Sequence, residues 1–164
     1  MRRNSKLAVI IAVLLSVSCL MNGCDHFGHI DSDIEGEKLS LKLLQYLNEN
    51  DSDSLKNMFC ERTRNSPDFY QEIEDVLEFF EGEVTSHDSL VGKTSDSKSM
   101  DNGKITRLYI VPDITSVETD EGKTYEIWFH TYLVNADHPD LVGIMQIVVV
   151  SADGERISAG EFYE

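Results

Sequence analysis

Aromatic, basic and acidic side chains alternate along the stretch TYEIWFHTYLV, residues 124–134, in a pattern that suits a recognition surface or an acid–base site. In an extended strand, successive side chains point to opposite faces. One face of this stretch carries Glu126, Trp128, His130, Tyr132 and Val134. Mixed aromatic and polar groups are typical of surfaces that contact a ligand or a protein, so we expect Trp128, His130 and Tyr132 to form a binding surface. Covering the back of a sheet, or forming a homodimer contact, is the alternative use of this face.

The opposite face of the same stretch is more apolar and is expected to face the interior. It carries Tyr125, Ile127, Phe129, Thr131 and Leu133. Phe80 belongs to an apolar helical stripe and should lie above this face. If a cavity lies between the helices and the sheet, we expect Phe80, Tyr125 and Phe129 to line it.

An enzyme would need an acid–base group inside such a cavity. Asp113 follows Pro112 within a strand pattern, and a buried aspartate there could act as a general base together with His130 or a tyrosine. His87 and His138 fall near expected loops and should be surface residues. No nucleophile, base and orienting group occur at a familiar spacing. The sequence therefore favours a non-catalytic binding module over the alternative, an isomerase-like or hydrolase-like enzyme.

No metal or cofactor is predicted. The stretch DSDIEGEKLSLK, residues 31–42, begins like a calcium-binding loop, with acids at its first, third and fifth positions and Gly36 at its sixth. Its twelfth position is Lys42, where such a loop requires a bidentate glutamate. An acidic helix start explains the stretch better. The chain also shows no Cys/His metal spacing and no glycine-rich phosphate loop.

The N-terminal segment has the pattern of a secretory signal, because basic residues precede an uncharged apolar run over residues 7–23. A membrane-spanning anchor is the alternative, although the run is at the short limit for a span. The run ends in LMNGC, which resembles the bacterial lipobox, where a cysteine after a small residue receives a diacylglycerol group. Cys24 is the expected lipid acceptor, and Cys19 is the competing site.

Export and lipidation would change both the cysteine count and the charge of the chain. Only Cys60 would remain as a free thiol, so the mature domain can form no internal disulfide, and Cys60 is expected to be a buried small hydrophobe. The formal net charge of −16 would become −19, because the removed segment carries three basic residues and no acid. So acidic a domain is repelled by nucleic acid and by anionic lipid, and two acyl chains would have to hold it at the outer, extracytoplasmic face of the cell membrane.

The remaining chain divides into a short tether and a single domain. We assign residues 1–23 to the signal peptide, 24–35 to the tether and 36–164 to an α+β domain. Leucine spacing predicts a helix from about residue 37 to residue 48, and Asp51 or Asp53 can cap a short second helix. A third helix should begin at an N-cap of Ser66 with Pro67 in its first turn, and end at Gly82.

Strand patterns follow the helices. Residues 83–93 are a modest candidate, 94–103 read as a polar loop, and 104–119 form a long strand that Pro112 breaks or marks as a bulge. Residues 120–123 form a turn. The two clearest strands lie within 124–137 and 141–154, and a short one within 156–163. Helices followed by an antiparallel meander predict helices packed on one face of a sheet.

Three phrases of the chain resemble a known family. LLQYLNENDSDSLKNMFC, FFEG and GKTYEIWFHTYLVNADHPDLVGIMQIVV, together with the lipoprotein signal, are similar to a family of uncharacterised Gram-positive lipoproteins that carry a domain of unknown function. The resemblance implies a nuclear transport factor 2-like, or cystatin-like, α+β fold. Such a fold has a strongly curved sheet wrapped around a long helix, with a conical cavity between them. The resemblance assigns no catalytic residue, and its superfamily includes enzymes as well as binding modules.

Overall fold

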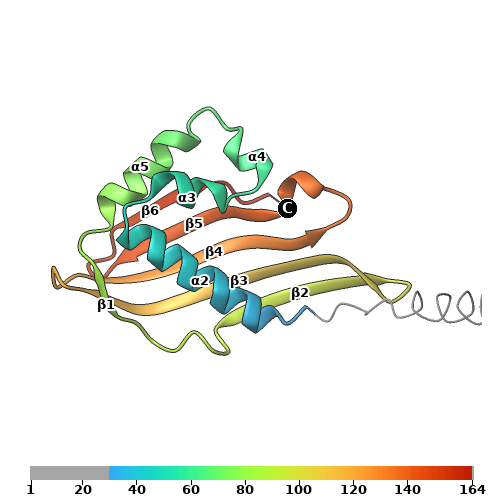
Figure 1. Cartoon of the computed structure of the whole chain (residues 1–164), viewed down its shortest axis with the longest axis horizontal. Helices are drawn as coiled ribbons and strands as arrows, with labels where there is room; N and C mark the ends of the chain where they lie inside the picture. The colour runs from blue at the N-terminus through green and yellow to red at the C-terminus, as the bar shows by residue number, and fades with distance from the viewer. Residues whose placement is uncertain (1–29, 164) are drawn as a thin grey trace, which may run out of the picture.

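The computed structural model describes residues 30–163, which form an antiparallel sheet with helices on one of its faces (Figure 1). The helices are α2 (Ser32–Asn48), α3 (Ser52–Asn57), α4 (Glu61–Arg64), α5 (Phe69–Phe79) and the short 3-10 helix η1 (Pro139–Leu141). The strands are β1 (Val84–Ser86), β2 (Thr94–Asp101), β3 (Lys104–Thr119), β4 (Thr124–Asn135), β5 (Gly143–Ser151) and β6 (Arg156–Gly160). The predicted α+β class is confirmed.

The three predicted helices all form, with shifted ends. Helix α2 begins at Ser32, inside the segment assigned to the tether, because the Asp31 side chain caps it by accepting hydrogen bonds from two backbone N–H groups. Asp51 caps α3 as predicted. Helix α5 begins after Asp68 and ends before Phe80, so the predicted N-cap at Ser66 is wrong.

Ser66 lies instead in the turn that follows α4, where its N–H donates to the Thr63 carbonyl. Helix α4 was not predicted, because four residues are too few to show a helical period.

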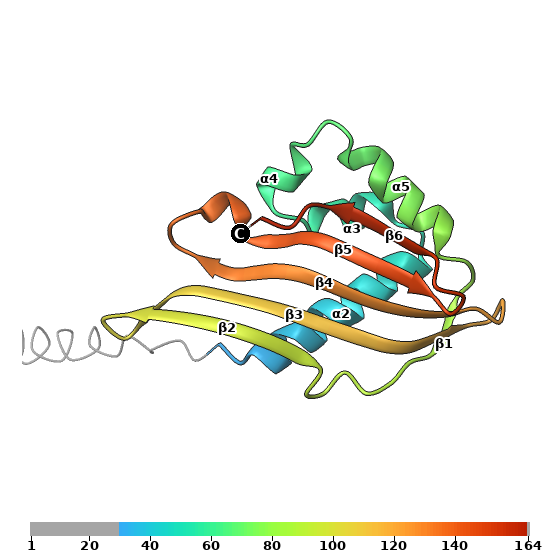
Figure 2. The same ribbon diagram turned by 180° about the vertical axis from the view of Figure 1, so that it is seen from behind.

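The sheet is open, and Figure 2 shows its strands from the side away from the helices. The strands follow the order β1-β3-β4-β5-β6, and β2 pairs with β3 beside β1. The predicted polar loop over 94–103 is wrong, because residues 94–101 form β2. Asn102 and Gly103 have φ values of 48° and 77°, which suit a two-residue hairpin turn. Nearly every side chain of β2 is exposed, so no alternation marked it as a strand.

Pro112 neither breaks β3 nor marks a bulge. The pairing of Ile110 with Thr131 and of Asp113 with Trp128 keeps one register across it. The bulge lies later, between Ile114 and Val117, where Ser116 adopts a φ of 55°. This bulge in β3, and an extra residue of β4 opposite Leu108 and Tyr109, set which β4 residue each β3 residue faces.

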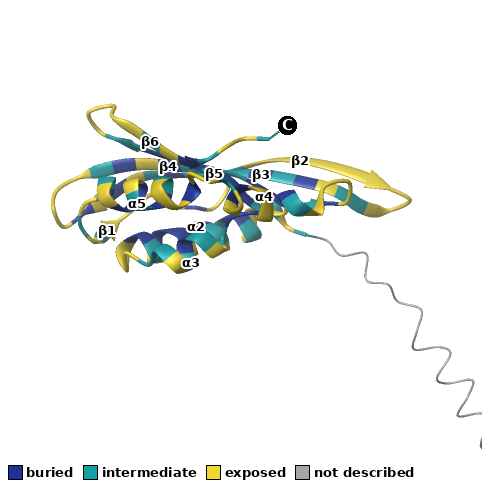
Figure 3. Cartoon of the chain, turned by 90° about the horizontal axis from the view of Figure 1, so that it is seen from above, coloured by how far each residue is buried: buried dark blue, intermediate teal, exposed yellow. Residues whose placement is uncertain are grey.

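The main hydrophobic core lies between the helices and the sheet, as the burial colours of Figure 3 show. Leu43 and Leu47 of α2, with Ile73 of α5, meet Ile127 and Phe129 of β4 there. A second, smaller core lies near α4 and η1, and is built from Cys60, Tyr132, Leu141 and Met145. The arrangement confirms helices packed on an antiparallel sheet, whereas the nuclear transport factor 2-like cone stays a prediction.

Gly160→Ala is expected to lower the free energy of unfolding by about 2–4 kcal/mol, because left-handed backbone and overpacking both oppose a side chain there. Gly160 has a φ of +79°, and an added Cβ would lie 2.1 Å from the Met145 carbonyl oxygen. Its N–H also donates to the Glu72 carboxylate at 2.8 Å, which fixes its backbone. Urea denaturation measures the change.

The control for this variant is Gly154→Ala. Gly154 has a φ of +87°, but nothing lies within 4 Å of its added Cβ, so only the backbone strain applies. A loss of about 1–2 kcal/mol is expected there. Equal losses for the two variants would show that the contact with Met145 carries no energy.

Candidate functional site

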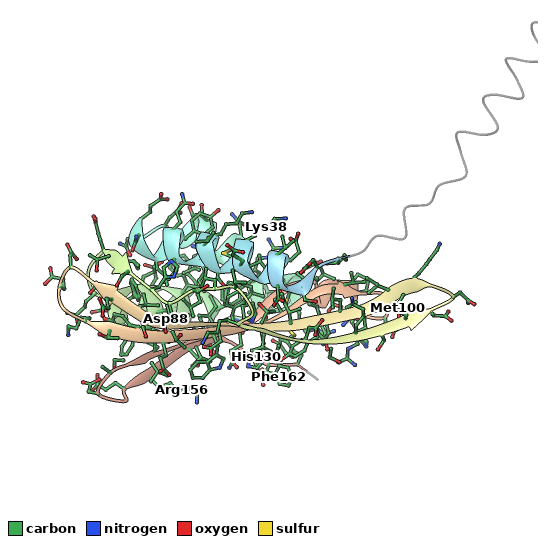
Figure 4. All side chains as sticks on the ribbon, turned by 90° about the horizontal axis from the view of Figure 1, so that it is seen from below. Lys38, Asp88, Met100, His130, Arg156 and Phe162 are labelled. Carbon is green, nitrogen blue, oxygen red and sulfur yellow. The ribbon has the colours of Figure 1, made fainter. Side chains whose placement is uncertain are left out.

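The face of the sheet opposite the helices carries two of the expected binding residues. Trp128 and His130 of β4 lie on it, because their neighbours Ile127 and Phe129 belong to the main core. Both side chains are partly buried. Figure 4 shows His130 on the side of the sheet away from α2. We call this surface the open face, because no helix of the described chain packs on it.

Cross-strand neighbours build a continuous row across the open face. Trp128 lies between Asp113 of β3 and Val148 of β5, and Val148 lies beside Ser158 of β6. Val148 is fully buried although it points away from the helices. Its neighbours on the open face therefore shield it, and an apolar patch forms around Trp128.

A cluster of three rings surrounds His130, and we call it the outer cluster: Tyr109, His130 and Phe162. The Tyr109 hydroxyl is hydrogen-bonded to Nδ1 of His130. The Phe162 ring lies 4.9 Å from the His130 ring and 6.0 Å from the Tyr109 ring, measured between centroids. Phe162 is 40% exposed, so the cluster presents an accessible aromatic edge.

The protonation states of the outer cluster follow from its burial. Burial lowers the pKa of His130 below its ordinary value. Burial, with a smaller contribution from Tyr132, raises the pKa of Tyr109. At neutral pH the imidazole is therefore neutral and the phenol keeps its proton, so the Tyr109 O–H donates to Nδ1. The His130 Nε2–H then remains as a hydrogen-bond donor for a ligand.

Trp128 carries a cation above its ring. The guanidinium carbon of Arg156 lies 5.5 Å from the ring centroid, within the range of a cation–π interaction. Arg156 is exposed, and Figure 4 places it on the same side of the sheet as His130. An arriving partner would thus meet an indole ring and a guanidinium group held together.

Tyr132, the third expected binding residue, is only 2% exposed and belongs to the second core. Its hydroxyl accepts a hydrogen bond from Arg107, whose guanidinium carbon lies 5.1 Å from the ring centroid. Its ring lies 5.3 Å from that of Tyr109. Tyr132 therefore supports the outer cluster from within, and only small parts of it can touch a partner.

The expected cavity residues Phe80, Tyr125 and Phe129 are all buried in the main core. The rings of Phe80 and Tyr125 lie 4.8 Å apart. The Tyr125 hydroxyl donates to the Phe79 carbonyl and accepts from the Glu81 N–H, at 3.2 and 3.0 Å. Side chains of the domain itself thus fill the space around these three residues.

A cavity of about 620 Å³ lies at the rim of this region, between the end of α5 and two strand turns. Tyr125 and Lys123 line it together with the acids Asp75, Glu78, Glu81, Asp153 and Glu155. Lys123 is paired with Glu81 at 3.2 Å. The acidic lining disfavours anionic ligands at this position.

The groups considered for catalysis do not converge. Asp113 is partly buried, and its backbone N–H donates to the Lys93 carbonyl, whereas His130 is hydrogen-bonded to Tyr109. His87 and His138 are exposed, as expected. Cys60 is fully buried, with its Sγ 3.3 Å from the Thr63 hydroxyl. These positions leave no paired nucleophile and base among the candidates.

Residues 30–163 were searched for a metal site and for a membrane-spanning helix. Within them, no group of three or more His, Cys, Asp or Glu side chains is placed to hold a metal ion. In the same range, no helix is both long and apolar enough to cross a membrane. The predicted lipid acceptor Cys24, the competing Cys19 and the predicted signal segment lie outside the described residues.

Sequence reasoning missed four residues of the open face: Arg107, Tyr109, Arg156 and Phe162. Alternation within residues 104–119 could have placed Arg107 and Tyr109 on one face with Asp113. It could not have placed Tyr109 beside His130, because that contact depends on the register between β3 and β4.

The chain matches a known protein family. Residues 42–152 match the family model described as "Domain of unknown function (DUF5104)", which spans α3, α5 and most of the sheet. No curated protein matches the chain.

Proposed function

The chain belongs to the family described as Domain of unknown function (DUF5104), and on that premise we propose that it is a lipid-anchored, non-catalytic binding module at the outer face of the cell membrane. Its binding element is the open face, where Trp128 and His130 contact a protein or a small ligand. A nuclear transport factor 2-like curvature of the sheet is part of this proposal, although such a fold alone does not decide between binding and catalysis.

The observation that carries the proposal is the group of partly exposed aromatic rings on the open face. Trp128 with Arg156 above it, and the outer cluster beside it, lie on a surface that no helix of the described chain covers. Tryptophan, tyrosine and arginine supply most of the energy at many interfaces, because they bury large areas while keeping polar groups available. The filled interior around Phe80 and Phe129 supports binding at this outer surface.

The polar groups of the open face suggest the chemistry of its partner. Arg107 and Arg156 bring two guanidinium groups to this side of a chain whose net charge is −16. His130 adds a neutral N–H donor. These groups suit a partner that presents carboxylates next to apolar surface, since guanidinium groups bind carboxylates through paired hydrogen bonds.

Anchoring through Cys24 explains how so acidic a domain would stay at a membrane. Acidic side chains repel anionic lipid, so the protein surface itself supplies no membrane affinity. A diacylglycerol group brings two acyl chains, which hold a protein stably where a single chain does not. The domain would then meet its partner outside the cell.

Trp128→Ala is expected to weaken partner binding about 30-fold, the equivalent of about 2 kcal/mol for a central aromatic anchor. Partners are first captured from a cell-surface extract and identified, and the purified partner is then titrated by calorimetry. The matched control is Tyr70→Ala. Tyr70 is an aromatic residue on α5 that is 60% exposed and lies on the helix side, so its removal should leave binding unchanged.

Two results would contradict this assignment. If Trp128→Ala unfolds cooperatively at the wild-type urea concentration and binds the same partner equally well, the site lies elsewhere. If Trp128→Ala does not fold, Arg156→Ala replaces it as the test, because Arg156 is exposed and its truncation should cost little stability. Unchanged binding by Arg156→Ala would then reject the open face.

A further inference from the structure

Strand β2 forms an unpaired edge of the sheet. It pairs with β3 along its whole length and with no other strand of the described chain. Figures 1 and 2 show it as the outermost strand on its side. Its side chains from Ser95 to Asp101 are exposed. A strand of this length at an open edge can accept another strand.

The hairpin determines which backbone groups of β2 remain free. The Asp113 N–H donates to the Lys93 carbonyl, and the same register pairs Ser95 with Val111 and Ser97 with Tyr109. In an antiparallel pair, hydrogen-bonded positions alternate with positions whose N–H and C=O groups point outward. The outward positions are Thr94, Asp96 and Lys98. No described residue donates to, or accepts from, their outward backbone groups.

The side chains at these outward positions lie on the helix side of the sheet. The Ser32 hydroxyl donates to the Asp96 carboxylate at 2.6 Å, and Thr94 lies against Gly36. Asp96 and Lys98 line one groove beside the start of α2, together with Asp31 and Asp33. Lys98 is exposed and forms no ion pair within 4 Å with any residue in 30–163.

We propose that β2 pairs antiparallel with β2 of a second copy of this chain, around a two-fold axis at Ser97, to form a homodimer. In this register Asp96 lies opposite the partner's Lys98, and the same ion pair forms twice because the axis relates the two copies. Met100, which is 59% exposed, lies opposite the partner's Thr94 and loses part of its exposure.

Backbone geometry and charge select this register over its neighbours. Backbone hydrogen bonds between the two β2 strands must join outward positions, which are even-numbered. If one strand shifts by a single residue, outward positions face inward ones and the backbone groups cannot pair. A shift of the axis by one position in either direction places Asp96 opposite the partner's Asp96, or Lys98 opposite the partner's Lys98. Like charges directly opposite each other destabilise a strand pair, so the axis at Ser97 is the favourable one of these three, and it is the register that places Asp96 opposite the partner's Lys98.

Charge complementarity extends beyond the two strands. Each Lys98 would reach the partner's groove, where the acids of the α2 start lie beside Asp96. The net charge of −16 on each chain opposes association at long range. Local pairing of the two Lys98 side chains with acids must therefore outweigh this repulsion for the copies to associate. Because the pairing needs Asp96 and Lys98 on both strands, the edge prefers a second copy of β2 over other strands.

Ser97→Cys tests the axis directly. The two-fold places Ser97 opposite the partner's Ser97 at a non-hydrogen-bonded position, where Cα atoms lie about 4.5 Å apart, within the range of a disulfide. The purified full chain in detergent is oxidised and run on a non-reducing gel. Ser97→Cys should give about tenfold more disulfide-linked dimer than either control, because only this position faces itself.

The controls are Ser95→Cys and Ser99→Cys, which are also exposed on the same strand. Each faces a serine of the partner in the proposed register, so neither should cross-link alone. An equal mixture of the two variants should cross-link, because Cys at 95 then meets the partner's position 99. The wild-type chain gives the background from its native cysteines.

A charge exchange tests the register independently, in the Ser97→Cys chain. Asp96→Lys or Lys98→Asp alone should reduce the cross-linked dimer about tenfold, because like charges then face each other twice. Both changes in one chain should restore it, because Lys at 96 then meets the partner's Asp at 98. Circular dichroism melts confirm that each variant is folded, and sedimentation of the unoxidised chain should show the same loss and recovery of the dimer.

Three results would overturn the proposal. If Ser97→Cys cross-links no more than Ser95→Cys, the two-fold axis does not lie at Ser97. If the double charge exchange does not restore the dimer, Asp96 does not lie opposite the partner's Lys98. Sedimentation as a monomer at every concentration would mean that Lys98 acts only to keep other strands away from the edge, as charged residues do on many edge strands.

Discussion

Phe80→Ala is expected to lower the free energy of unfolding by about 3–5 kcal/mol, the range for a large buried aromatic side chain. Phe80 is 6% exposed and packs in the main core. Its ring lies 4.8 Å from that of Tyr125, so truncation would leave a cavity beside a tyrosine whose hydroxyl is fixed by two hydrogen bonds. Since domains of this size are stable by about 5–15 kcal/mol, the variant would lose a large part of its stability.

Urea denaturation of the full chain measures this loss, and Phe162→Ala is the matched control. Phe162 is also a phenylalanine but is 40% exposed on the open face, so its removal should cost about 1 kcal/mol or less. A change within about 0.5 kcal/mol for Phe80→Ala would mean that the end of α5 packs elsewhere.

Cys24→Ser is expected to abolish lipid attachment completely. In our proposal the Cys24 thiol is the atom that receives the diacylglycerol group, and a serine hydroxyl is a far weaker nucleophile than a thiolate. Radiolabelled palmitate should enter the wild-type chain and vanish from this variant, and the protein should move from the membrane fraction to the soluble fraction. Both readouts are close to all-or-none.

Cys19→Ser and Cys60→Ser are the controls for this experiment. Cys19 is the competing acceptor, and Cys60 is fully buried, so both variants should keep the label. Label that persists in Cys24→Ser but vanishes in Cys19→Ser would move the lipid acceptor to Cys19. It would also move the start of the mature chain.

The elements that could be predicted from sequence are those that bury one side. Leu43, Leu44 and Leu47 mark one face of α2, and Phe69, Ile73 and Val76 mark one face of α5. Their spacing is set by the helical period, which acts over a few residues. Strands β4 and β5 could also be predicted, because each has one face in the core.

The elements that could not be predicted lack a buried side or are too short. Strand β2 is held by hydrogen bonds to β3 and by the turn at Asn102 and Gly103, so its side chains follow no hydrophobic pattern. Helix α4 has four residues, fewer than two turns. Helix α5 begins after Asp68 rather than after Ser66, and Ser66 belongs to the turn that follows α4, a contact between two short segments that no helical period reveals.

Some residues of the candidate site could likewise be predicted from sequence, and others could not. Strand geometry alone put Trp128 and His130 on one face, since the side-chain period of two is a property of any extended backbone. The same rule put Tyr132 beside them, but the register shift after His130 and the approach of α4 and η1 buried it in the second core.

The α+β class, the longer helices and strands and the shared face of Trp128 and His130 therefore follow from the sequence alone, because these depend on local periods and on the burial of apolar side chains. Only the tertiary structure decided that Tyr109 and Phe162 meet His130, that Arg156 lies over Trp128, and that β2 forms an open edge. Each of these contacts joins residues on different strands or at the chain end. Their meeting depends on bulges and hairpin registers that couple distant parts of the chain, and no short window of sequence contains that information.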